Sequence, residues 1–277
     1  MATNEERRLE AKRALEQRLA ANEAAAKRSR MLSIVAAVVA VLVLVGVAGY
    51  LLLAKKDTIG AAEVSGGTLP KFVAPAGLGA NCQYPAAEAA SKKNKPPRAG
   101  KVPTDPAQVS VSMSTDQGNI GLQLDNAKAP CTVNSFSSLA QQGYFDSTPC
   151  HRLTTQGIFV LQCGDPTGSG TGGPGYKFAN EYPTNQYPPN SPDSAAEKNV
   201  IYPRGTLAMA NAGPDTNGSQ FFLVYQDSPL PPQYTAFGTI DATGLKTLDK
   251  IAKAGVKGGS ADGAPATPVK IKQIRLD

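Results

Sequence analysis

Residues 149–165, with the sequence PCHRLTTQGIFVLQCGD, decide the expected fold of this chain. They hold the only histidine, His151, next to Arg152, and Gln162 closes the apolar run that follows Gly157. Two short strands around a glycine-containing turn are typical of a β-hairpin. If Arg152 lies across from Gln162, both side chains emerge on one face, and Val160 shares that face because side chains alternate along a strand. The stretch therefore predicts an apolar surface with a fixed cation at its edge.

A second stretch, residues 205–222, reads GTLAMANAGPDTNGSQFF. An apolar strand from Leu207 to Ala210 precedes a loop rich in Asn, Gly, Pro and Asp, and the chain re-enters a strand at Gln220. Together the two stretches resemble the signatures of the cyclophilin family of peptidyl-prolyl cis-trans isomerases. The resemblance covers about residues 108–277.

The apolar pattern of this region agrees with the family's order of elements. Alternating residues predict an opening hairpin over 109–124, and Pro130 begins a helical pattern that Gly143 ends. A second helix is expected around 245–251 and a closing strand over 269–276. By resemblance the fold is mainly β, a closed eight-stranded antiparallel barrel capped by two helices.

The resemblance also implies an activity, the rotation of X-Pro peptide bonds. Rotation makes and breaks no bond, so we expect neither a cofactor nor a metal. Arg152 is the expected catalytic residue, because a permanently protonated guanidinium offers several donors to a twisted amide. The residues expected to bind the proline-containing polypeptide are His151, Phe159, Val160, Gln162, Ala210, Asn211, Gln220, Phe222, Leu230 and Tyr234.

Other interpretations stay open. A non-catalytic proline-binding or chaperone-like module is the alternative function, although the intact set of Arg, Gln and Phe favours an enzyme. The apolar residues are also compatible with a plain barrel core, which we prefer for Phe221. No Gly-x-Ser-x-Gly elbow accompanies His151, which argues against a catalytic triad. The glycine-rich residues 168–176 lack the Gly-Lys-Ser/Thr ending of a phosphate-binding loop.

Two departures from the family pattern matter. Two extra residues stand between Arg152 and Gln162, so the turn is enlarged and the position of Phe159 is less defined. The chain has no tryptophan, and Pro229 stands where cyclosporin-sensitive members carry one. We therefore predict weak cyclosporin binding, because an indole donor and its apolar face are missing.

The residues before this domain predict a membrane anchor. Residues 31–54 are apolar and carry no charge, and their length exceeds the roughly 20 residues that cross a bilayer as a helix. Residues 1–30 read as a charged helix with an excess of Lys and Arg, which places the N-terminus in the cytoplasm and the domain outside. A cleaved signal peptide is the alternative, but Lys55 and Lys56 stand where small residues are wanted.

Residues 55–107 are rich in Ala, Gly, Pro and Lys and show neither helical nor strand periodicity. We interpret them as a flexible linker, which spans on the order of 40 Å for about fifty residues.

Four cysteines, Cys82, Cys131, Cys150 and Cys163, permit two disulfides in three connectivities if the domain lies outside the cytoplasm. The assumed hairpin register places Cys150 and Cys163 on opposite faces, which disfavours a bond between them. A weak preference falls on Cys131 with Cys150, and free thiols remain possible. The formal net charge is +6, and the basic residues are spread over the cytoplasmic end and the linker without a pattern of interleaved aromatic and basic residues. An anionic envelope surface is therefore a simpler partner than nucleic acid.

Overall fold

The computed structural model describes residues 67–187 and 198–277. The predicted charged helix (1–30) and membrane span (31–54) lie outside the described residues. Within the described part, no helix is both long enough and apolar enough to cross a membrane.

A ten-stranded antiparallel sheet forms most of the domain, in the order β11-β4-β5-β8-β7-β10-β2-β1-β12-β3. Its strands are β1 (Val109–Thr115), β2 (Asn119–Leu124), β3 (Thr148–Cys150), β4 (Arg152–Thr154), β5 (Val160–Cys163), β7 (Thr206–Met209), β8 (Phe221–Val224), β10 (Ala236–Ile240), β11 (Asp262–Gly263) and β12 (Val269–Leu276). The strands β6 (Val200–Tyr202) and β9 (Ser228–Leu230) form a separate pair. Two short 3-10 helices are η1 (Thr184–Gln186) and η2 (Lys257–Gly259).

The sheet is strongly curled but is not the predicted closed eight-stranded barrel. Its order has two ends, β11 and β3, and no strand pairing joins them within the described residues. Strands β3 and β4 follow each other in the chain with only His151 between them, yet β3 pairs with β12 and β4 pairs with β5 and β11. The chain therefore crosses from one end of the sheet to the other at His151, which curls the sheet without a closing ladder.

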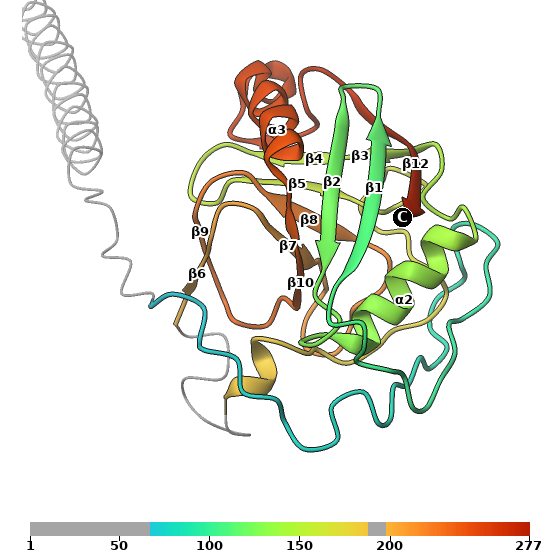
Figure 1. Ribbon diagram of the computed structural model, residues 1–277. Helices are drawn as coiled ribbons and strands as arrows, with labels where there is room; N and C mark the ends of the chain where they lie inside the picture. The colour runs from blue at the N-terminus through green and yellow to red at the C-terminus, as the bar shows by residue number, and fades with distance from the viewer. Residues whose placement is uncertain (1–66, 188–197) are drawn as a thin grey trace, which may run out of the picture. The chain divides into compact units, whose positions relative to one another are not determined.

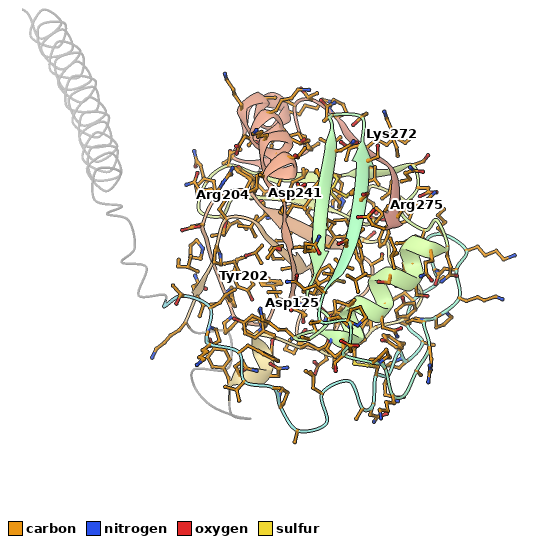
Figure 2. The ribbon with its side chains drawn as sticks, in the orientation of Figure 1. Asp125, Tyr202, Arg204, Asp241, Lys272 and Arg275 are labelled. Carbon is orange, nitrogen blue, oxygen red and sulfur yellow. A yellow bond between two sulfur atoms is a disulfide. The ribbon has the colours of Figure 1, made fainter. Side chains whose placement is uncertain are left out.

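Two helices pack against the sheet, as predicted. Helix α2 (Pro130–Gln141) has a proline in its first turn, and α3 (Ala242–Ala254) is capped by Asp241, whose carboxylate accepts the Gly244 N–H at 2.6 Å. Figure 1 shows the two helices near opposite ends of β1 and β2, and Figure 2 labels Asp241 beside α3.

Helix α2 has no side-chain cap of its own. The buried carboxylate of Glu181 takes that role from a distant loop, since it accepts the N–H groups of Cys131 at 3.0 Å and Thr132 at 2.8 Å. Free N–H groups at a helix N-terminus favour such an anion.

The core has two clusters. The larger lies between the sheet and the helices and includes Phe136, Phe145 and Phe221, so our preference for Phe221 as a core residue is confirmed. The smaller contains Val160, Tyr182, Val200, Tyr202, Ala208, Phe222, Val224, Leu230 and Ala236. This second cluster supports the candidate site described below.

Residues 67–107, which we call the strap, are packed against the domain, so the prediction of a flexible linker is wrong for them. The N–H and carbonyl groups of Cys82 and Gly100 bond each other at 2.8 Å, and Tyr84 Oη donates to the Cys131 carbonyl at 2.7 Å. Lys92 Nζ donates to three carbonyl oxygens just after α2, those of Gly143, Tyr144 and Asp146. Figure 1 shows the strap running along the domain.

The two disulfides are Cys82–Cys131 and Cys150–Cys163. Both results contradict the preference for Cys131 with Cys150, and the second contradicts the expectation that a bond within the Arg152 hairpin is disfavoured. That expectation assumed one continuous strand through His151. Because the strand is interrupted there, strict alternation of side chains does not extend to Cys150.

Candidate active site

The hairpin of β4 and β5 supplies the polar edge of the site. Arg152 pairs with Gln162 and Leu153 pairs with Leu161, which confirms the register predicted from the sequence. Because side chains alternate, Arg152, Gln162 and Val160 share one face. Strand β8 continues this surface, since Val160 pairs with Val224 and Gln162 with Phe222.

A cavity of about 160 Å³, here called the slot, lies on that face. It is lined by Arg152, Ile158, Val160, Gln162, Ala210, Asn211, Phe222, Leu230 and Tyr234. Val160, Phe222 and Leu230 are buried, and the Phe222 and Tyr234 rings meet edge to face with centroids 5.7 Å apart. The apolar side chains of this lining can accept a small ring or an aliphatic side chain, while Arg152, Gln162 and Asn211 supply polar groups beside it.

The structure brings most of the predicted site residues into the slot but leaves out Phe159. The Phe159 ring packs edge to face on Tyr225, at 6.0 Å between centroids, and its N–H bonds Ser228 Oγ at 2.8 Å. Ile158 lines the slot instead. Gln156 and Ile158 form an isolated β-bridge within the enlarged turn, which is the segment where the position of Phe159 was predicted to be less defined.

His151 and Gln220 also lie outside the slot. A Cβ built on Gly170 would be 3.4 Å from the His151 ring, so this ring packs against the glycine-rich loop. Its Nδ1 is buried and has no hydrogen-bond partner among the described residues. Burial lowers the pKa of His151, Asp165 opposes this shift, and the Arg152 charge adds to it. His151 therefore packs against the glycine-rich loop and does not line the slot.

Arg152 is held by two neighbouring strands. Its Nε and Nη2 donate to the two carboxylate oxygens of Asp262 at 2.7 and 2.6 Å, and its Nη1 donates to Gln162 Oε1 at 3.3 Å. The hydrogen bonds that Arg152 donates to Asp262 raise the pKa of Arg152 and lower the pKa of Asp262. The guanidinium is thus a fixed, permanent cation at the edge of the slot.

Sequence reasoning missed Asp262. It lies 110 residues from Arg152 in the chain, on a strand of two residues with no periodic pattern. No spacing or motif could have identified it.

Gln220 belongs to a second, larger cavity of about 390 Å³ that shares Gln162, Ala210 and Asn211 with the slot. The glycine-rich loop and the strap residues Ala87, Glu88, Ala89 and Ser91 form much of its wall. Asp165 orders this loop by accepting the N–H groups of Thr167, Gly170 and Gly172. The strap therefore shapes a cavity beside the slot, which the linker interpretation did not anticipate.

Within the described residues, no group of three or more His, Cys, Asp and Glu side chains could hold a metal ion. The chemistry present is a cation with hydrogen-bond donors beside an apolar slot. Such a site can hold a ring and bond a neighbouring carbonyl oxygen.

Comparison with known proteins shows the family to which this chain belongs. The family model described as cyclophilin type peptidyl-prolyl cis-trans isomerase matches residues 110–276. A protein of Mycobacterium leprae named "Probable peptidyl-prolyl cis-trans isomerase B" is 68% identical over 211 residues, which are 76% of this chain and 71% of that protein. Its namesake in Mycobacterium tuberculosis is 69% identical over 211 residues, 76% of this chain and 68% of the relative.

A solved structure agrees. The crystal structure of a cyclophilin type peptidyl-prolyl cis-trans isomerase from Cryptosporidium parvum is 29% identical, with a TM-score of 0.50, and the match covers 61% of this chain and 98% of that one. The two mycobacterial matches extend beyond the residues that the family model covers. Each spans 211 of the 277 residues, and a stretch of that length necessarily includes the strap. The chain therefore belongs to the cyclophilin-type peptidyl-prolyl cis-trans isomerases, and it catalyses the rotation of X-Pro peptide bonds between cis and trans.

Proposed function

We propose that Arg152 lowers the rotation barrier without any covalent step. The barrier of about 18–20 kcal/mol arises from amide resonance, which is lost in the twisted state as the nitrogen regains its lone pair. A hydrogen-bond donor that binds this twisted state more strongly than the planar states lowers the barrier. The observation that carries the proposal is the position of the guanidinium, a fixed donor group at the edge of an otherwise apolar slot. A proline ring in the slot brings its carbonyl oxygen and its amide nitrogen close to that edge.

The remaining slot residues bind two different parts of the substrate. Val160, Phe222, Leu230 and Tyr234 bind the proline ring, while Gln162, Ala210 and Asn211 bind the substrate backbone. Only contacts that are stronger in the twisted state than in the planar ground states accelerate the reaction. Each 1.4 kcal/mol of such preference gives about tenfold in rate, so one charge-assisted bond in a water-poor slot supplies a large share.

The test compares the full chain with its Arg152→Ala variant in a cis-trans exchange assay on an Ala-Pro peptide. We expect kcat/KM to fall by at least about 100-fold, with peptide binding reduced far less. Ser110→Ala, a change on the exposed side of β1 far from the slot in sequence and in the sheet order, is the matched control and keeps full activity. Equal activity of Arg152→Ala and the wild type contradicts the mechanism.

We propose further that the isomerase is anchored in the cell membrane, with residues 1–30 in the cytoplasm and the domain outside. The uncharged residues 31–54 and the basic residues before them support this arrangement. The two disulfides support it independently, because such bonds persist in oxidising compartments and are rare in the cytosol. Its substrates are then polypeptides that fold outside the membrane, where slow proline isomerisation limits folding.

Protease added to intact spheroplasts tests the orientation. We expect digestion to remove the domain while a cytoplasmic marker stays intact, and the protein to remain in the membrane fraction after alkaline carbonate extraction. A protected domain, or release by carbonate, contradicts the anchored arrangement.

A further inference from the structure

The carboxylate of Asp262 binds the side chain that the proposed mechanism uses. Its Oδ1 accepts from Arg152 Nε at 2.7 Å and its Oδ2 from Nη2 at 2.6 Å. The pairing of β11 with β4 sets this contact, because Asp262 lies opposite Thr154 and Gly263 opposite Leu153. Two parallel bonds between planar groups fix the plane of the guanidinium as well as its position.

We propose that Asp262 is a positioning residue for isomerisation, which orients the guanidinium of Arg152 at the edge of the slot. The proposal rests on the proposed role of Arg152 and adds to it the residue that makes that role effective. Asp262 is absent from the slot lining, so it acts through Arg152 and does not touch the substrate.

The donors of Arg152 explain how this works. A guanidinium has five N–H donors; two of them bond Asp262 and one bonds Gln162. The other two have no partner among the described residues, and they are available to a substrate carbonyl. Asp262 on β11 and Gln162 on β5 hold the group from both sides of β4, so little orientation remains to be fixed in the transition state.

A purely structural role is a poor explanation for this pair. The side chains of Arg152 and Asp262 are 40% and 52% exposed, and exposed ion pairs contribute little to folding because water screens them. The negative charge of Asp262 also offsets part of the positive charge that the substrate meets. Holding the geometry is the benefit that outweighs this loss, since an unconstrained arginine samples many rotamers.

The experiment measures kcat and KM of the full chain with Asp262→Ala, Asp262→Glu and the matched control Ser260→Ala. Ser260 Oγ donates to the Asp262 carbonyl oxygen, so its loss perturbs the same loop and leaves the carboxylate in place. We expect Asp262→Ala to lower kcat by about tenfold with KM changed less than about twofold. Asp262→Glu should restore part of kcat, and Ser260→Ala should match the wild type.

A double-mutant cycle separates this proposal from the mechanism on which it rests. If Asp262 acts through Arg152, then Asp262→Ala changes the residual rate of the Arg152→Ala variant by less than about twofold. In parallel, NMR of the Arg152 Nε–Hε group should show that this group becomes more mobile in Asp262→Ala. An equal loss in both backgrounds, or an unchanged kcat in Asp262→Ala, overturns the role of Asp262 alone. Full activity of Arg152→Ala overturns the mechanism and this proposal together.

Discussion

Gln162 and Gln220 are bonded through their side-chain amides, with Nε2 of Gln162 donating to Oε1 of Gln220 at 2.9 Å. Gln162 also accepts from Arg152, and Gln220 Nε2 donates to the carbonyl oxygens of Gly170 and Gly172. A continuous series of hydrogen bonds thus runs from Arg152 to the glycine-rich loop. Because the N–H₂ and C=O groups of both side-chain amides are hydrogen-bonded, each amide is held in one orientation.

This series of hydrogen bonds predicts the effect of Gln162→Ala. Arg152 then keeps Asp262 but loses its contact on the opposite side, and Gln220 loses a donor. We expect kcat/KM to fall about three- to tenfold, because one hydrogen bond to a charged group and one amide contact are lost. Gln123→Ala, which removes an amide bonded to Ser110 on β1, is the control. Exchange NMR on a proline peptide measures both, and equal rates contradict the role of Gln162.

Ile158 and Phe159 should respond differently to truncation. Ile158→Ala removes slot surface, so we expect KM to rise severalfold while stability changes by less than about 1 kcal/mol. Phe159→Ala removes a ring packed on Tyr225, and we expect about 2 kcal/mol of destabilisation with a smaller change in KM. Urea denaturation and steady-state kinetics on the same preparations measure both effects. The reverse assignment of the two effects contradicts the placement of Ile158 in the slot.

The two disulfides should have separable effects. Cys150→Ser with Cys163→Ser opens a loop of 13 residues that contains Arg152 and Gln162, so we expect a loss of about 3 kcal/mol and a clear fall in activity. Cys82→Ser with Cys131→Ser opens a loop of 49 residues, and we expect a loss of about 4 kcal/mol. In that variant the strap becomes accessible to limited proteolysis before the sheet, and the enzyme keeps most of its activity because the Arg152 hairpin is unchanged. Proteolysis of both variants at the same sites would contradict this separation.

Glu181 should make stability depend on pH. Burial raises the pKa of Glu181, and its hydrogen bonds from Thr132 and Cys131 oppose the rise. In the unfolded chain the carboxyl deprotonates near its ordinary pKa of about 4.3. Above that pH the folded state therefore binds more protons than the unfolded state, and the free energy of unfolding falls as pH rises through the folded pKa.

We accordingly expect Glu181→Gln to flatten this part of the stability curve while weakening the cap of α2. Denaturation at several pH values measures both variants. Glu88→Gln, which removes an exposed carboxylate on the strap, is the control and should leave the slope unchanged. Parallel curves for the wild type and Glu181→Gln contradict a raised pKa.

Cyclosporin should bind weakly. Pro229 lies on β9, paired with Ile201, and the chain has no tryptophan to offer an indole. The loss of one aromatic hot spot costs at least about 2 kcal/mol, so we expect an affinity at least about 30-fold below that of a tryptophan-bearing relative. Inhibition of peptide isomerisation measures this, and inhibition at equal concentrations in the two enzymes contradicts it.

Local pattern explains which features were predictable. The Arg152–Gln162 register follows from alternation and turn position within one hairpin, and the α2 boundaries follow from Pro130 and Gly143. The prediction that Phe159 lines the slot was wrong, because the turn has two extra residues and Ile158 takes that place. The Cys150–Cys163 bond was missed because the sequence does not reveal the interruption at His151.

The role of Asp262 and the packing of the strap could not be predicted from the sequence, for a different reason. Their contacts join residues distant in sequence and have no repeat to mark them. Cys82, Tyr84 and Val102 are buried, yet they are too sparse for any helical or strand period. Backbone bonds and a disulfide hold the strap, and neither leaves a hydrophobic pattern.

The packed strap also changes the distance at which an anchored enzyme works. Of the residues between the proposed span and the sheet, only the twelve residues 55–66 precede the strap. Even fully stretched, they reach at most about 40 Å. An enzyme anchored in this way can act only on polypeptides that come within the reach of this short tether from the membrane.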